Sequence, residues 1–165
     1  MTFVTVARSS GVDIRVVEGG FLSFSNSPYY AHKQGLAVDL YPGNTGSMAF
    51  SPVDGVIVGK YTIKSPRPKH FRAVETEQLL LIRPVNEADL AVRVLHVDSP
   101  LVIGSEVQVG TSLGSLVRSG FFDFWTENHI HVEVRSLSQP LRAKGSILML
   151  PLQGGGVEGS PCGHI

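Results

Sequence analysis

The stretch His129–Arg135, which reads H-I-H-V-E-V-R, has the greatest capacity for chemistry in this sequence. Side chains alternate between the two faces of a β-strand, so both histidines, the glutamate and the arginine would share one face. The three aliphatic residues between them would share the other face and suit a hydrophobic core. Since residues two apart in a strand lie about 6.6–7 Å from each other, His129 and His131 can reach one cleft. One ring would bind a metal ion, and the other would contact the substrate that binds at this ion.

A second polar residue interrupts an otherwise apolar stretch earlier in the chain. Leu36, Val38 and Leu40 form one face of the strand expected over residues 36–41, which places Asp39 on the opposite face. Aspartate is disfavoured inside strands, so Asp39 needs a partner there, and a cation is the simplest one. His32 precedes this strand, in a segment that can fold back over the start of the strand.

These residues together favour a metal site. Zinc binds histidine nitrogen and aspartate oxygen, and a catalytic zinc site keeps a fourth position open for water. Each residue taken alone has a simpler interpretation, because a strand aspartate can pair with an arginine and a histidine can be satisfied by hydrogen bonds. Two histidines and a carboxylate on polar faces, with a further histidine, are less easily explained in that way.

The same blocks resemble the M23 family of zinc metallopeptidases, the LytM/lysostaphin-like endopeptidases that cut peptidoglycan cross-links. His129–Arg135 is similar to the family segment H-[LIV]-H-[FVW]-E-[VLIW]-R, which is its most specific signature. Ser51–Ile57 resembles the turn A-x-x-D-G-x-V, Leu95-His96 resembles the strand Y-x-H-L, and Gly104–Gly114 resembles the glycine-spaced pattern that follows it. The order and separation of these blocks match over residues 28–136.

The resemblance implies a site, a cofactor and an activity. His32, Asp39 and His131 would be the ligands of a Zn²⁺ ion, and His96 and His129 would be the catalytic pair beside it. His129 would serve as general base while His96 stabilises the tetrahedral intermediate, or the two roles could be exchanged. An unperturbed imidazole pKa of about 6.5 permits both roles near neutral pH. The implied activity is zinc-dependent hydrolysis of amide bonds in a peptide or a peptidoglycan cross-link by a metal-activated water.

The chain departs from the family pattern in three places. Six residues separate His32 from Asp39 where the family has three, so Lys33–Leu36 is expected to loop out. His96 shares a strand face with two valines, which also suits a core histidine. The family has small residues before the histidine pair, whereas Phe121–Asn128 is aromatic and acidic. This stretch would either wall the groove differently, which indicates an altered substrate, or pack over the sheet.

Short apolar runs and alternations, separated by turn signals, predict strands rather than amphipathic helices. One short helix is expected around Asn86–Leu90. The pattern predicts an all-β fold, an antiparallel sheet or sandwich with a substrate groove, and the resemblance implies the duplicated, hybrid-motif type of M23 proteins. The expected strands are Phe3–Val6, Val12–Val17, Leu36–Tyr41, Val56–Tyr61, Gln78–Arg83, Ala91–His96, Glu106–Val109, Leu113–Val117, His129–Arg135 and Ile147–Leu150.

Length and composition suit one domain. The chain has 165 residues, 42% of them hydrophobic, and its 14 basic and 14 acidic residues give no formal net charge. We expect a single M23-like domain over residues 1–152 and a flexible tail over residues 153–165. A neutral charge argues against nucleic-acid binding, and no apolar run is long enough to span a bilayer. The oligomeric state is not indicated.

The remaining sequence features bear on compartment and binding. No signal peptide is visible, so a cytoplasmic location is expected, or an extracellular one if a leader has been removed. The single cysteine, Cys162, excludes an internal disulfide, and its pairing with His164 at a metal would be adventitious. Lys60–Glu77 is basic and forms either a solvated hairpin loop or a lid that contacts an anion or the substrate.

Two other functions compete with the peptidase. A non-catalytic M23-like module, with an incomplete or purely structural metal site, would bind or regulate a partner, and the displaced His32 and the aromatic stretch favour it. Sugar-phosphotransferase IIA-like carriers share the G-x-x-V-x-x-G pattern. Their phosphohistidine chemistry, however, does not need Asp39 or the H-x-H strand.

Overall fold

A computed structural model describes residues 1–24, 27–152 and 157–158. Strands dominate these residues, and nearly all of them pair in the antiparallel sense. The described residues contain one short α-helix, α1 (Tyr30–Lys33), and one 3-10 turn, Gly43–Thr45. The predicted all-β class is therefore confirmed.

The strands form one large sheet and one small sheet. The small sheet has the order β12 (Leu150–Pro151), β1 (Phe3–Ser9) and β2 (Val12–Val17). The main path of the large sheet runs β13 (Val157–Glu158), β3 (Phe21–Ser23), β4 (Ala37–Tyr41), β11 (Ile130–Ser136), β8 (Leu90–Asp98), β7 (Thr76–Pro84), β6 (Gly55–Lys64) and β9 (Glu106–Val107). Off this path, β10 (Ser112–Leu116) pairs with β8 and with β5 (Met48–Phe50).

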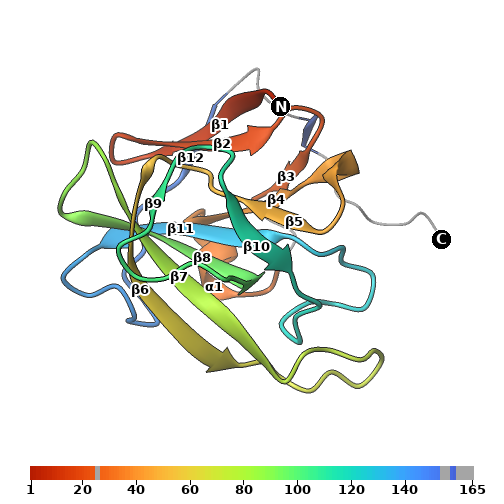
Figure 1. The fold of residues 1–165 in the computed structure, drawn as a ribbon. Helices are drawn as coiled ribbons and strands as arrows, with labels where there is room; N and C mark the ends of the chain where they lie inside the picture. The colour runs from red at the N-terminus through yellow and green to blue at the C-terminus, as the bar shows by residue number, and fades with distance from the viewer. Residues whose placement is uncertain (25–26, 153–156, 159–165) are drawn as a thin grey trace.

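A single main core joins the two sheets. It contains buried aliphatic side chains from β1 and β2 together with those of β4, β8 and β11. In Figure 1, β1 and β2 lie above the strands of the large sheet. Ile130, Val132 and Val134 of β11 are 3%, 0% and 0% exposed and belong to this core, as the alternation predicts. The polar residues between them therefore lie on the opposite face of β11.

Pairing places β11 between the two strands that carry the other predicted site residues. His131 is in register with Asp39 of β4 on one side and with Leu95 of β8 on the other. Figure 1 shows β11 running through the middle of the sheet beside β8. The residues that matter for chemistry thus come from three adjacent strands and from the helix that precedes β4.

Most expected elements are observed. Every expected strand overlaps an observed one, and β3, β5 and β13 are additions. The helix expected around Asn86–Leu90 is wrong. This segment is instead a pair of turns between β7 and β8, in which Glu87 N–H donates to the carbonyl of Pro84 and Leu90 N–H to that of Glu87. A hairpin connection this short leaves no room for a helical turn that continues.

The other regions singled out in the sequence have varied outcomes. Lys60–Glu77 is a hairpin, with Lys64 opposite Thr76 at the end of the β6–β7 ladder. The expected tail, with Cys162 and His164, lies outside the described residues except for β13, which pairs with β3. Among the residues that the structure describes, no helix has the length and apolar character needed to cross a membrane.

Candidate metal centre

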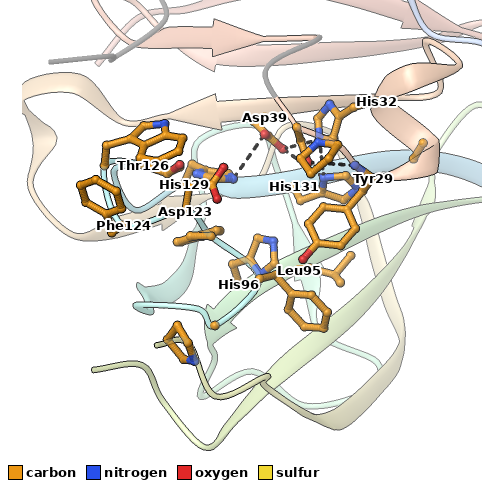
Figure 2. A pocket seen from close by; sticks show the side chains of 18 of the residues that line it. Tyr29, His32, Asp39, Leu95, His96, Asp123, Phe124, Thr126, His129 and His131 are labelled. Atoms are coloured by element: carbon orange, nitrogen blue, oxygen red, sulfur yellow. Dashed lines mark hydrogen bonds and ion pairs between the residues drawn. The ribbon is translucent and has the colours of Figure 1, made fainter. Parts of the chain in front are cut away.

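The three predicted ligands, His32, Asp39 and His131, meet on the polar face of the large sheet. One ligand atom from each of them can be chosen so that all lie within 4.8 Å of one another. His32 and Asp39 are 4% and 3% exposed, so the cluster is largely shielded from water. Figure 2 shows the three side chains pointing toward one another, joined by dashed contacts.

His32 reaches the cluster through α1. Of the segment expected to loop out, Lys33 is the last residue of the helix, and residues 34–36 form a tight turn before β4. The N–H groups of the turn donate to helix carbonyls at 2.7–3.1 Å, and Gly35 has a φ of +69°, which glycine adopts without strain. The additional residues between His32 and Asp39 are therefore absorbed by helical turns, and the histidine returns over the start of β4.

Hydrogen bonds to fixed acceptors set the tautomers of both ligand histidines. Nδ1–H of His32 donates to the carbonyl of Phe24 at 3.0 Å, and Nε2–H of His131 donates to Glu133 at 2.7 Å. The remaining nitrogens, Nε2 of His32 and Nδ1 of His131, lie 3.1 Å apart. They lie 3.1 and 3.0 Å from Oδ1 of Asp39. Three hydrogen-bond acceptors so close together repel one another unless a proton or a cation lies among them.

The donor set fits zinc. Bonds of about 2.0–2.1 Å in a tetrahedral site place the ligand atoms about 3.3–3.4 Å apart, and the observed separations of 3.0–3.1 Å are close to this. Two imidazoles and one carboxylate make three protein ligands and leave a fourth position for water or substrate. The bond from His131 to Glu133 matches the carboxylate–histidine pairs that orient metal ligands in proteins.

The pKa values in the cluster follow from burial and mutual charge. Burial lowers the pKa of His131, but its hydrogen bonds to Asp39 and Glu133 outweigh burial and raise it to about 9. Burial raises the pKa of Asp39, yet the charge of His129 and the hydrogen bonds from His131 and His32 hold it well below its ordinary value. Burial likewise opposes ionisation of Glu133, whose pKa is lowered by His131 and Arg93. Asp39 and Glu133 therefore stay ionised in the metal-free protein, and His131 carries the proton that a metal ion would displace.

His129, one of the two predicted catalytic histidines, lies directly beside the cluster. Its Nδ1–H donates to the carbonyl of Glu127 at 2.8 Å, and its Nε2 lies 3.4 Å from Oδ2 of Asp39. The ring is held between Phe122, stacked at 4.2 Å, and Tyr41 at 4.6 Å. Burial lowers the pKa of His129 to about 4 despite the charge of Asp39. The ring is therefore neutral at pH 7, and Nε2 can accept a proton.

His96, the second predicted catalytic histidine, lines the same groove as the cluster. The strand-face argument that grouped it with core valines is wrong because β8 bulges. Between Val94 and Val97 it has one residue more than β7 opposite, and His96 has a φ of +71°. Consecutive residues Leu95 and His96 consequently both line the groove. Nδ1–H of His96 donates to the buried Glu77 at 2.6 Å.

The groove above these residues has a volume of about 870 Å³. Its lining includes all five predicted site residues, the turn of the β6–β7 hairpin, and aromatic side chains. In the stretch Phe121–Asn128, Phe122 is buried against His129, whereas Phe124 and Trp125 are 60% and 50% exposed. The stretch therefore both packs on the sheet and walls the groove.

Three residues of the site have no predicted role. Glu133 was placed on the right strand face by alternation, but its bond to His131 was not foreseen. No local sequence pattern indicated a role for Glu77 or Arg118. Glu77 reaches His96 from β7, 19 residues away in the chain. Arg118 holds the backbone of the stretch that follows it.

Fold and site together define an antiparallel β protein with a His–Asp–His cluster at the floor of a groove. The chain belongs to the family described as the N-terminal domain of DUF8155, a domain of unknown function, whose model matches residues 16–151. No curated protein matches the chain.

Proposed function

We propose that this protein is a zinc-dependent hydrolase of peptide amide bonds, of the M23 type. One observation carries the proposal: two imidazole nitrogens and a carboxylate oxygen converge at 3.0–3.1 Å on the floor of a groove. The likeness of His129–Arg135 and of the neighbouring blocks to M23 peptidases supports the choice of reaction. A peptide or a peptidoglycan-like cross-link is the proposed substrate.

The proposed ligands are His32, Asp39 and His131. An ion bound there would polarise the scissile carbonyl and lower the pKa of water. Nε2 of His129 would accept the proton of the attacking water as general base, because its Nδ1–H is held by a backbone carbonyl and the ring is neutral at pH 7. His96, with Nδ1–H held by Glu77, lines the groove; with a second proton on Nε2, its Nε2–H would donate to the reacting oxygen.

Two single variants separate metal binding from catalysis. His131→Ala is expected to lose zinc and hydrolysis together. His129→Ala is expected to keep zinc and to lose hydrolysis by about 10²–10⁴-fold, the usual contribution of a general base. Tyr61→Ala is the control, because Tyr61 is exposed on β6 and does not line the groove. Zinc content by elemental analysis and cleavage of peptides and peptidoglycan fragments are the measurements.

The assignment is contradicted if His131→Ala retains wild-type zinc, or if His129→Ala retains wild-type turnover. A binding module is the second candidate function. It is favoured by the 3% exposure of His129, since Phe122 and Tyr41 cover the ring on which the proposed base catalysis depends. One zinc per chain with no hydrolysis of any peptide or peptidoglycan fragment would support the module instead.

A further inference from the structure

The segment Phe121–Thr126, here called the aromatic loop, presents two large apolar side chains to the groove. Phe124 and Trp125 are 60% and 50% exposed, and both line the groove that contains the His–Asp–His cluster. Their rings meet edge to face at 4.7 Å, and His70 of the hairpin turn contacts Phe124 at 6.3 Å. This apolar surface lies open to water beside the reacting centre.

Arg118 donates hydrogen bonds to the backbone of the aromatic loop. Its guanidinium donates to the carbonyl oxygens of Thr126, Asp123 and Phe124, the last two at 3.2 and 2.9 Å. It also lies over the ring of Phe71 at 4.3 Å. A side chain that donates to three backbone carbonyls of one loop fixes the backbone of that loop. The exposed aromatic pair is therefore preorganised, which reduces the entropy lost when a ligand binds.

Two tyrosines at the start of α1 extend the aromatic lining of the groove. Tyr29 and Tyr30 are 47% and 48% exposed and line the groove, and Tyr29 contacts the ring of Phe121 at 6.0 Å. Figure 2 shows Tyr29 on one side of the cluster and Phe124 on the other. A substrate that lies over His131 would therefore have aromatic side chains of the groove lining on either side (Figure 2).

We infer that the aromatic loop, positioned by Arg118, selects peptides with a bulky apolar side chain next to the scissile bond. The inference rests on the proposed function and names its substrate class. Such a side chain would remove the faces of Phe124 and Trp125 from water, whereas glycine would leave them exposed. Beside these aromatic side chains the lining has one acidic residue, Asp123, and one basic residue, Lys69. This part of the groove therefore favours neither acidic nor basic substrates.

The test uses the zinc-loaded protein and two probes. One probe is a capped pentaglycine peptide, and the other is the same peptide with its central residue replaced by phenylalanine. Trp125 is the single tryptophan of the chain, so its fluorescence reports directly on the aromatic loop. The phenylalanine peptide is expected to bind at least about tenfold more tightly, to shift the Trp125 emission, and to be cleaved with a correspondingly higher kcat/KM.

Three variants assign the preference to the loop. Phe124→Ala is expected to reduce the preference to within about threefold while zinc content stays at the wild-type value. Arg118→Gln leaves the aromatic side chains in place and is expected to reduce the same ratio, because the loop is no longer fixed. Tyr61→Ala is the control, since Tyr61 is 40% exposed on β6 and does not line the groove. It should leave the ratio unchanged.

The outcomes distinguish the inference from the proposed function. Zinc binding with equal affinity for both peptides overturns the inference and leaves the hydrolase intact. No zinc binding overturns the hydrolase, and the fluorescence titration then still decides whether the aromatic loop prefers the phenylalanine peptide. Tighter binding of a muramyl disaccharide than of either peptide overturns the inference in favour of glycan recognition.

Discussion

Glu133→Gln tests how the sheet orients His131, a proposed metal ligand. The carboxylate of Glu133 accepts Nε2–H of His131 at 2.7 Å and a bond from Arg93 at 2.8 Å, and it also accepts from Ser146. Glutamine keeps the shape and one acceptor oxygen but removes the charge that fixes the histidine tautomer. Loss of such a partner weakens metal binding by about 10–100-fold, or about 1.4–2.8 kcal/mol.

The same substitution has a second effect on the metal-free protein. The side chains of Arg93 and Glu133 are 12% and 4% exposed, so Arg93 would keep a nearly buried charge without an anionic partner. Breaking a buried ion pair costs about 3–5 kcal/mol, and we expect about 3 kcal/mol here because glutamine still accepts a hydrogen bond.

Zinc affinity is measured by competition with a chelator, and the free energy of unfolding by urea denaturation in the presence of a chelator. Glu106→Gln is the matched control, because Glu106 is exposed on β9. It should change neither quantity. A folded Glu133→Gln variant whose zinc affinity stays within threefold of wild type would refute the orienting role of Glu133.

The remaining predictions concern pH, the helix end and the core. Hydrogen bonds raise the pKa of His131 from 6.5 to about 9, so the metal-free protein has this stabilisation in full below pH 6.5 and loses it as pH rises through 9. Zinc added at pH 8 should release about one proton per ion, and calorimetry in two buffers that releases none would contradict this. Gly35→Ala and Gly46→Ala, at φ of +69° and +78°, should each cost about 1–3 kcal/mol. Only the first should also weaken zinc binding, because Gly35 ends the helix that carries a ligand. Leu80→Ala, at a fully buried position, should cost about 2–5 kcal/mol in urea denaturation, and a loss below 1 kcal/mol would place Leu80 outside the core.

Strand alternation is the part of the fold that local sequence predicts well. The period of two over His129–Arg135 is sufficient to separate core residues from polar ones, because β11 is regular and pairs with a strand on each side. The same reasoning fails at His96, where the bulge in β8 inserts one residue and turns the following side chains to the other face. A bulge is fixed by the pairing of distant strands, so a single strand does not reveal it.

Side-chain contacts that strand alternation does not reveal account for the other differences. Glu77 reaches His96 from the neighbouring strand, and Arg118 reaches the backbone of the aromatic loop that follows it; composition encodes neither contact. The spacing between His32 and Asp39 suggested a loop, whereas main-chain hydrogen bonds make it a helical turn. The length of a spacer does not determine where its ends lie once it can form local hydrogen bonds.

The most direct test of the metal centre is zinc stoichiometry by elemental analysis after removal of metal, reconstitution and dialysis. The wild-type chain should retain about one zinc, and Asp39→Ala should retain none. Asp123→Ala, which removes a carboxylate of the groove wall outside the cluster, should bind as wild type does. A reconstituted wild-type protein without zinc, or an Asp39→Ala variant with the same zinc content, would contradict the assignment of His32, Asp39 and His131 as a metal site.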